Sequence, residues 1–348
     1  MTTARHISTA PLLGILLALA PGAARAVEPA VHAEASLGFD TNPLREAGGE
    51  QGVYPFLGAL FDAGLVHGGE RSTLRASLSE GARLFGGAAS DADVLASRLD
   101  LEGAWAAGER LDLGGSLALR DISELGGVRS ETGGQLRLDA RLRLARFDVD
   151  AGGGLSALYP RTTRLENFAS IGPDAGIGLG FSPADGQHVR IGWDLLVRNY
   201  PDWPDVERDD VANVGSLEWT RRGSLIAGAG YALTANHSSA PGGTYLRHRI
   251  WLRAAAELPW EVTLAGLGSL QWSNYPGGII SEAERLLAEN DERQNALELR
   301  FSRPIGFDLE AVLKLAAYGG EFSRGDGGVA RLEYRREVVQ LSIGWRPE

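Results

Sequence analysis

The chain has 348 residues, of which 47 are glycine and none is cysteine, and its formal net charge is −11. The absence of cysteine excludes disulfides and a lipid-anchored cysteine, and the acidic balance argues against binding to nucleic acid. Mean hydropathy is −0.11, and no segment approaches the roughly twenty apolar residues of a membrane-spanning helix. The high glycine content suits curved strands and tight turns rather than helices.

The first residues predict a cleavable export signal. Arg5 precedes an apolar run, Pro11–Ala20, and Ala24-Arg25-Ala26 follows it. A basic start, about ten apolar residues and a small-residue cleavage site characterise a secretory signal. We predict a signal peptide over residues 1–26 and one domain over residues 27–348, with an uncut N-terminal anchor as the alternative.

The remaining chain alternates apolar and polar residues in segments of strand length. Within Gln135–Ala145, every second residue from Leu136 to Leu144 is Leu or Ala, and those between are charged or amide side chains. Side chains of a strand point to opposite faces in turn, so this segment has one apolar and one charged face. A soluble sandwich would bury the apolar face, whereas a transmembrane barrel turns it toward lipid and keeps the charges in a wet lumen.

Sixteen such strands are predicted, joined alternately by short turns and long loops. They lie at Val31–Asp40, Val53–Val66, Ser72–Leu84, Val94–Trp105, Leu111–Arg120, Gln135–Ala145, Phe147–Tyr159, Ile171–Phe181, Val189–Tyr200, Val211–Trp219, Ser224–Thr234, Tyr245–Leu258, Val262–Trp272, Asn295–Phe301 and Phe307–Tyr318, with a last strand ending at Trp345. Two final strands, Val329–Arg335 and Val338–Trp345, would make the number odd. The predicted fold class is all-β, a transmembrane antiparallel up-and-down β-barrel of about sixteen strands, within a range of about 14 to 18.

Aromatic residues support a membrane location. One group falls beside the short turns and another where strands meet long loops: Trp105, Trp219, Trp260 and Phe307, and Tyr159, Tyr200, Trp272 and Tyr275. Two such bands are typical of interfacial girdles. The alternative is a soluble all-β protein whose aromatic residues flank its strands.

The predicted first strand contains Gly38-Phe39-Asp40-Thr41-Asn42, followed by Pro43. This segment resembles the opening Gly-aromatic-Asp-x-Asn strand of β-barrel porin families, and the predicted mature chain resembles bacterial outer-membrane β-barrels in general. The resemblance implies an outer-membrane location in a Gram-negative bacterium. Some of those families accompany capsule or exopolysaccharide export, which makes such export an alternative role. The C-terminus departs from the usual pattern because Arg346-Pro347-Glu348 follows Trp345.

The polar face of each strand supplies the candidate pore-lining residues. They are Arg98, Asp100, Glu102, Arg137, Asp139, Arg141, Arg143, Arg190, Asp194, Arg198, Arg247, Arg249, Arg253, Glu298, Arg300, Asp308, Glu310 and Lys314. Carboxylates gather toward the short turns, namely Asp112, Asp148, Asp150, Glu257, Glu261, Asp308 and Glu310, whereas Arg198, Arg247 and Arg249 lie nearer the long loops. Opposed charges of this kind would sort hydrated solutes by charge. The alternative is that they pair across strands and merely keep the lumen polar.

The longest loop contains a predicted helix, Ser281–Asn290. Ser281 and Glu284 have the spacing of a capping box, and good helix formers follow. Such a helix would narrow the mouth, offer a docking surface or cover the rim.

Catalysis is the competing hypothesis. His237 beside Ser238 and Ser239, in a predicted long loop, is the candidate for a nucleophile and its base. The other histidines are scattered without metal-ligand spacing, and His248 falls on the lipid-facing register. We therefore expect no enzyme activity, no cofactor and no metal.

The sequence predicts a porin-like passive channel for small polar or charged solutes. One alternative is a conduit that exports a surface polysaccharide with a periplasmic partner at the acidic rim, and a less supported one is a surface-exposed barrel enzyme. The expected partners are outer-membrane lipid and the transported solute or polysaccharide, without nucleic acid. Barrels of this size often form homotrimers, a hypothesis that no feature of this sequence tests.

Overall fold

The computed structural model describes residues 27–43, 52–126, 130–162, 168–203, 207–240, 243–276, 295–322 and 332–347. Within these ranges the chain forms sixteen β-strands, with short 3-10 helices such as η1 (Gly87–Ala92) and η3 (Pro259–Glu261) between them. The strands are β1 (Val27–Asp40), β2 (Tyr54–Gly68), β3 (Ser72–Phe85), β4 (Val94–Ala106), β5 (Leu111–Glu124), β6 (Glu131–Leu144), β7 (Phe147–Pro160), β8 (Ser170–Phe181), β9 (Gln187–Tyr200), β10 (Arg208–Arg221), β11 (Leu225–Ser238), β12 (Tyr245–Leu258), β13 (Val262–Asn274), β14 (Asn295–Gly306), β15 (Leu309–Phe322) and β16 (Leu332–Trp345). The predicted signal peptide and the predicted helix Ser281–Asn290 lie outside the described residues.

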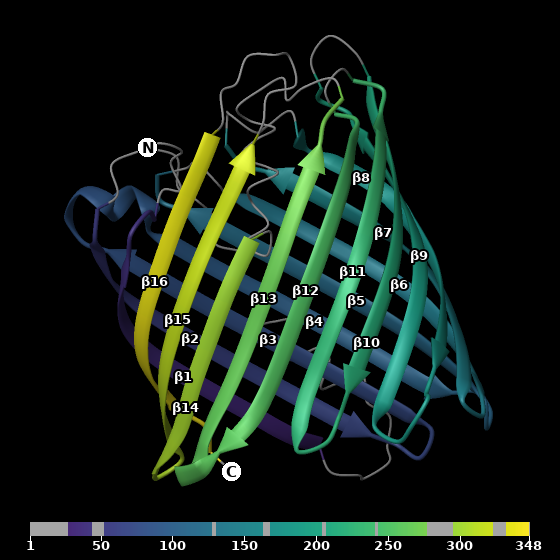
Figure 1. The fold of residues 1–348 in the computed structure, drawn as a ribbon, viewed down its shortest axis with the longest axis horizontal. Coiled ribbons are helices and arrows are strands. Elements are labelled where there is room, and N and C mark those ends of the chain that lie inside the picture. Colours follow the sequence, from purple (N-terminus) through teal and green to yellow (C-terminus); the bar gives the residue numbers. More distant parts are fainter. Residues whose placement is uncertain are drawn as a thin grey trace.

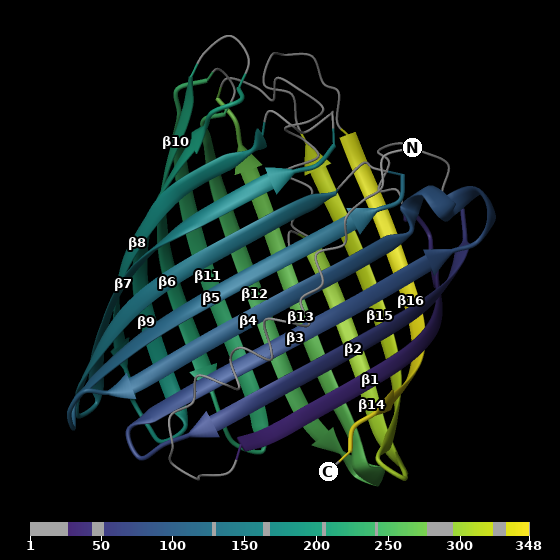
Figure 2. The same cartoon turned by 180° about the vertical axis from the view of Figure 1, so that it is seen from behind.

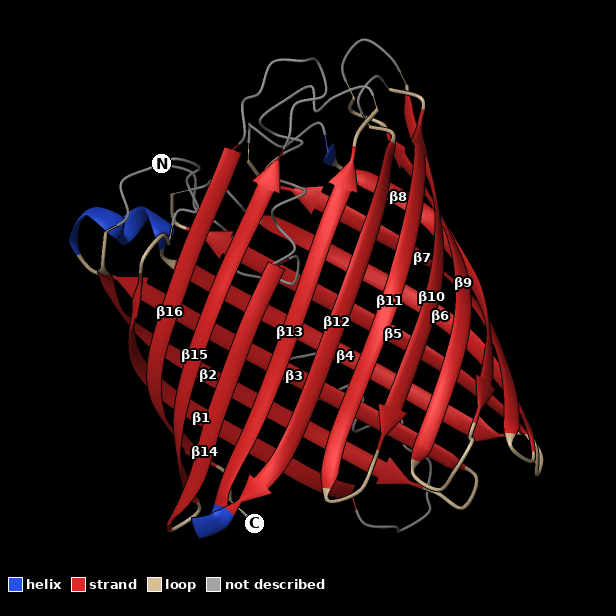
Figure 3. Cartoon of the chain, in the orientation of Figure 1, coloured by secondary structure: helices blue, strands red, loops and turns tan. Residues whose placement is uncertain are grey.

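Each strand pairs with its sequence neighbours and β1 pairs with β16, so the sheet closes into a barrel (Figures 1 and 2). Figure 3 shows that strands form nearly the whole wall and run at a tilt to the barrel axis, as closure of a barrel requires. The predicted up-and-down barrel is confirmed. The single final strand is confirmed as well, since β16 runs without interruption to Trp345. No helix in the described part of the chain is long and apolar enough to cross a membrane.

The two faces of the wall differ in chemistry. Large apolar side chains such as Leu138, Ile177 and Leu341 occupy one register and are 66%, 51% and 53% exposed. On the other register, charged groups meet across an intervening strand, as Arg190 on β9 meets Asp150 on β7. Side chains converge on the concave side of a curved sheet, so the charged register faces the interior. An apolar outer wall around a polar interior is the arrangement of outer-membrane barrels and places this chain in that membrane.

Short turns join the strands at one rim, and longer connections join them at the other (Figure 1). We call these the short-turn rim and the long-loop rim. β1 begins and β16 ends near the short-turn rim, because Val27 pairs with His67 and Trp345 pairs with Ala33. The predicted start of the fifteenth strand at Phe307 is wrong. β14 continues to Gly306, and Phe307 and Asp308 form a turn with φ of 55° and 60° before β15 begins.

Aromatic residues form the predicted outer bands only in part. Exposed members at the two rims are Trp105, Trp260, Phe307, Tyr159 and Trp272. Tyr200 does not belong to the outer band, because it pairs with Arg208 on the inner register and its ring lies 4.6 Å from that guanidinium. Tyr275 packs against Tyr245, a residue of the inner register, with ring centroids 5.4 Å apart. Alternation along a strand separates its residues into two faces. Which residues face the interior follows only from the register with the neighbouring strands.

Candidate functional site

Charged side chains on the inner wall between β6 and β9 bridge strands that are not neighbours. The Arg190 guanidinium donates two hydrogen bonds to Asp150, from Nε to Oδ1 at 3.0 Å and from Nη2 to Oδ2 at 2.6 Å. Arg137 on β6 similarly donates to Asp174 on β8, with 2.6 Å between Nη1 and Oδ1. Each pair spans a whole strand, so the strand between must leave space for it.

Glycine provides this space on β8. Gly176, Gly178 and Gly180 occupy alternate inner positions of the strand, and we call them the glycine floor. A Cβ atom at Gly178 would lie 2.5 Å from both Arg190 Nη2 and Asp150 Oδ1. Only a residue without a side chain therefore lets this ion pair lie flat against the wall.

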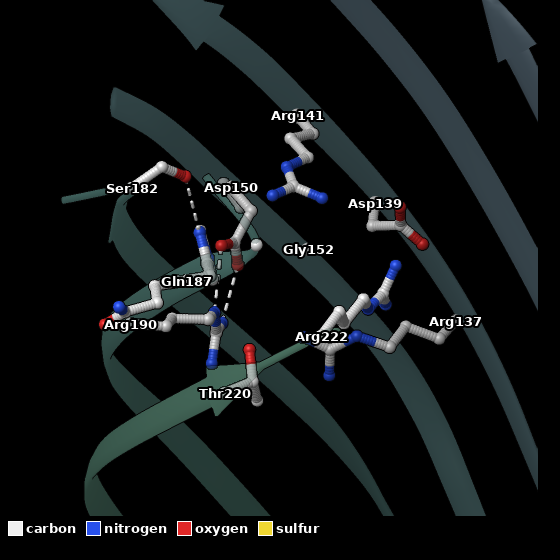
Figure 4. Close-up of a pocket in the computed structure, with 13 residues that line it drawn as sticks. Arg137, Asp139, Arg141, Asp150, Gly152, Ser182, Gln187, Arg190, Thr220 and Arg222 are labelled. Carbon is white, nitrogen blue, oxygen red and sulfur yellow. Dashed lines mark hydrogen bonds and ion pairs between the residues drawn. The ribbon is translucent and has the colours of Figure 1, made fainter. Parts of the chain in front are cut away.

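The flat ion pairs border a hollow in the inner wall near the short-turn rim (Figure 4). Its volume is about 670 Å³, and its polar lining includes Arg137, Asp139, Arg141, Asp150, Ser182, Gln187, His188, Arg190, Thr220 and Arg222. We call it the inner-wall hollow. Arg141 binds Asp148 at 2.8 Å, and the Ser182 hydroxyl lies 3.3 Å from His188 Nδ1. A hollow of this size with convergent polar groups suits a small polar molecule.

Two charged side chains that line the inner-wall hollow do not belong to these ion pairs. Among the residues that the structure describes, neither Asp139 nor Arg222 has an oppositely charged side chain within ion-pair distance. Asp139 leans over Gly114 of β5. The hollow thus offers one carboxylate and one guanidinium that a bound molecule can engage directly.

Other inner charges are paired, as the alternative interpretation of the sequence proposed. Lys314 Nζ lies 3.1 Å from Glu298, and Arg300 lies 3.7 Å from Glu310 and 3.8 Å from Glu34 on β1. Further pairs are Arg98 with Asp100 and Arg143 with Asp112, each at 2.6 Å. Because Asp112, Asp148, Asp150 and Glu310 each have an arginine partner, the short-turn rim carries no bare ring of those carboxylates.

A second polar feature follows β12. Its inner register carries alternating aromatic and basic side chains, which we call the β12 stripe: Tyr245, Arg247, Arg249, Trp251 and Arg253. The Arg247 guanidinium lies 4.5 Å from the Tyr245 ring centroid and donates to Ser273 Oγ at 3.1 Å. Beside the stripe, burial raises the pKa of Tyr275 above its ordinary value. The stripe extends from the long-loop rim toward the inner-wall hollow.

The structure places the predicted pore-lining residues on the inner register, with the exception of Asp308 in its turn. Their role in lining a conducting pore stays a prediction. The inner-wall hollow brings together residues of β6 and β9, including Arg137, Arg141 and Arg190. Lys314 and Glu298 lie on β15 and β14 and do not join this hollow.

The candidate catalytic pair is not supported. His237 lies within β11 rather than in a loop, paired with Val211 on the outer register. Ser238 follows it and faces the interior, so the two side chains point to opposite sides of the wall. Among the described residues, no group of three His, Asp or Glu side chains could hold a metal ion.

Sequence reasoning missed several members of the site. Asp174 and Arg222 are absent from the predicted set, although both contribute charge to the inner wall. The glycine floor was visible as Gly176-Ile177-Gly178-Leu179-Gly180, in which every second residue lacks a side chain. Such a pattern on one face of a strand signals that neighbouring side chains pass over it.

No protein-family model matches this sequence, and no curated protein matches it. Among solved structures, a bacterial polysaccharide outer membrane secretin has 11% sequence identity and a TM-score of 0.46, and the match covers 92% of this chain and 98% of the other. OprD of Pseudomonas aeruginosa has 8% identity and a TM-score of 0.45, with 92% and 95% coverage. OccD3 (OpdP) of Pseudomonas aeruginosa has 10% identity and a TM-score of 0.44, with 94% coverage of both chains. These likenesses concern the barrel fold alone.

Proposed function

We propose that the protein is a passive outer-membrane channel for small polar or charged solutes. The observation that carries the proposal is the inner-wall hollow, where ion pairs lie flat across the glycine floor and a volume of about 670 Å³ stays unfilled. If the inner wall served only the stability of the fold, its charged side chains would not need to lie flat against it. A passage for solutes gains both width and polar contacts.

The proposed mechanism combines exclusion by width with exchange of hydrogen bonds. A hydrated solute entering the hollow meets guanidinium donors and carboxylate acceptors that already hold fixed positions. These groups replace part of its water shell, which reduces the free-energy barrier to crossing. Because the contacts are many and individually weak, the solute also leaves readily, and its gradient sets the direction of net movement.

Swelling of liposomes that contain the purified barrel tests this proposal. We expect rapid swelling in isotonic solutions of small neutral sugars and amino acids, and slower swelling with Gly178→Leu, whose side chain enters the space of the Arg190–Asp150 pair. Gly215→Leu is the matched control, because Gly215 lies on the outer register of β10, paired with Leu233 on β11, and nothing lies within 4 Å of its Cβ position. Folded barrel that leaves swelling at the level of empty liposomes would refute the proposal.

A further inference from the structure

Among the described residues, two inner arginines near the short-turn rim, Arg222 and Arg253, lack acidic partners. Within the described ranges, no Asp or Glu side chain lies within ion-pair distance of Arg222 or Arg253. Arg253 on β12 pairs in register with Gly228 on β11, which in turn pairs with Thr220 on β10. Arg222 follows the last residue of β10 and lines the same inner-wall hollow as Thr220. Gly228 therefore lies between Arg253 and Thr220, which precedes Arg222 by two residues.

Gly228 leaves room for the Arg253 side chain. A Cβ atom at Gly228 would lie 2.8 Å from Arg253 Nε, so the Arg253 side chain extends across β11 in the direction of Thr220. Adjacent strands are about 4.8 Å apart, which places the backbones of Arg253 and Thr220 about 10 Å apart. Thr220 and Arg222 line the inner-wall hollow. The Arg253 side chain thus reaches from the β12 stripe over Gly228 toward the Thr220 edge of the hollow.

Carboxylates lie near these arginines without forming an ion pair with either, and Asp139 lines the inner-wall hollow together with Arg222. Arg190 is neutralised by Asp150, and the nearest other carboxylate by register is Glu218, which pairs with Arg190 one inner position above Thr220. On β12, Glu257 lies toward the rim. On β14 and β15, by contrast, Arg300 and Lys314 contact carboxylates. Neither Glu218 nor Glu257 forms an ion pair with Arg222 or Arg253, so both guanidinium groups stay available to a solute.

We infer that Arg222 and Arg253 form an anion-binding step in the lumen, which selects solutes that carry a carboxylate or phosphate group. Guanidinium groups present paired N–H donors that match these anions, and they keep their charge at any physiological pH. Arg253 lies 5.2 Å from the Trp251 ring, which holds it in place without neutralising it. The inference rests on the proposed channel function and makes small anions the solutes that the channel prefers.

Reversal potentials in a potassium chloride gradient test the inference, with acetate and inorganic phosphate as competing anions. We expect the wild-type channel to prefer chloride over potassium, and Arg222→Gln or Arg253→Gln to reduce that permeability ratio about threefold each, as expected for one screened charge. Both variants should also weaken the block of chloride current by phosphate. Glu218→Gln should change the ratio in the opposite direction, which misfolding cannot imitate.

Arg221→Gln is the matched control. Arg221 is the neighbour of Arg222 in sequence but pairs with Ala227 on the outer register, so its loss should leave the ratio unchanged. A conducting channel whose ratio is the same in wild type, Arg222→Gln and Arg253→Gln would overturn the anion-binding step while leaving the channel proposal intact. Absence of any conductance from folded wild-type barrel would overturn the channel proposal itself.

Discussion

Asp40 on the first strand and Arg336 on the last strand bind each other across the seam that closes the barrel. Arg336 Nη2 lies 2.7 Å from Asp40 Oδ2, its Nε lies 3.1 Å and 2.9 Å from the two carboxylate oxygens, and both side chains are buried. The next residues continue the contact: Glu337 N donates to Thr41 Oγ1 at 2.8 Å, and Asn42 Nδ2 donates to Arg335 O at 3.2 Å. A slip of one residue would turn Asp40 to the outer face, so these contacts fix the register of closure. The Asp-Thr-Asn segment noted in the sequence is thus part of the seam.

Removing one partner of the seam pair should destabilise the barrel strongly. Asp40→Asn leaves a buried guanidinium without its counter-charge, and we expect the free energy of unfolding to fall by about 3 kcal/mol. Urea unfolding in lipid vesicles measures this free energy. The folded fraction is read from the heat-modified shift of the folded band on a gel. The double variant Asp40→Asn with Arg336→Met should recover most of the loss, because the buried guanidinium is gone and Arg83, which lies 3.9 Å from Asp40, is partly exposed. A single variant as stable as the wild type would contradict the role assigned to the pair.

Adding a methyl group to the glycine floor should also reduce stability. In Gly178→Ala, the new Cβ atom lies 2.5 Å from Arg190 and Asp150, so the ion pair must move. We expect a loss of about 1–3 kcal/mol, typical of overpacking. Gly215→Ala, where the new atom meets open space, should stay within about 0.5 kcal/mol of the wild type. Equal effects of the two substitutions on the unfolding free energy would show that β8 tolerates a side chain here.

Glu80 is a carboxylate on the outer face of the wall. It pairs in register with Phe61 and Ser97, accepts a hydrogen bond from the Ser97 hydroxyl at 2.5 Å, and has Leu78 and Ala82 as its outer neighbours on β3. Charged groups on the lipid face oppose insertion, so Glu80→Leu should stabilise the barrel in a bilayer by about 1 kcal/mol. Glu102→Leu, on the inner register, should give no such gain. A loss of stability in Glu80→Leu would instead indicate that a protein surface, not lipid, covers this position.

Arg208 is enclosed by aromatic rings at the long-loop rim. Its guanidinium lies 4.3 Å from the Trp203 ring centroid and 4.6 Å from that of Tyr200, and it binds Asp210. Trp203→Ala should lower the free energy of local opening at this rim by about 2 kcal/mol, the value of a desolvated cation–π contact. Hydrogen exchange of the adjoining ends of β9 and β10 reports that change. Trp260→Ala, which removes a side chain that is 80% exposed at the other rim, should leave those amides unaffected.

The fold followed from the sequence because its two strongest signals are local. Alternation at a period of two and the turn residues between segments locate strands without knowledge of their partners. The same reasoning failed where register decides the outcome. Tyr200 faces Arg208 because of its register, and His237 lies in β11 because pairing with β10 extends that strand to Ser238.

The site was less accessible to sequence reasoning because its contacts cross intervening strands. The Arg190–Asp150 pair joins β9 to β7, residues 40 positions apart, and depends on Gly178 between them. Periodicity predicts that both side chains face the interior, but it does not predict that they bind each other. That choice depends on curvature, stagger and the absence of a side chain on β8.

Single-channel recording of the purified barrel in a planar bilayer tests the central claim most directly. We predict stable conductance steps in potassium chloride, with a preference for chloride that Arg222→Gln reduces. Silence from a barrel that is folded, as judged by its heat-modified migration, would mean that the lumen is closed to ions and would contradict the account of the inner-wall hollow as part of a solute passage.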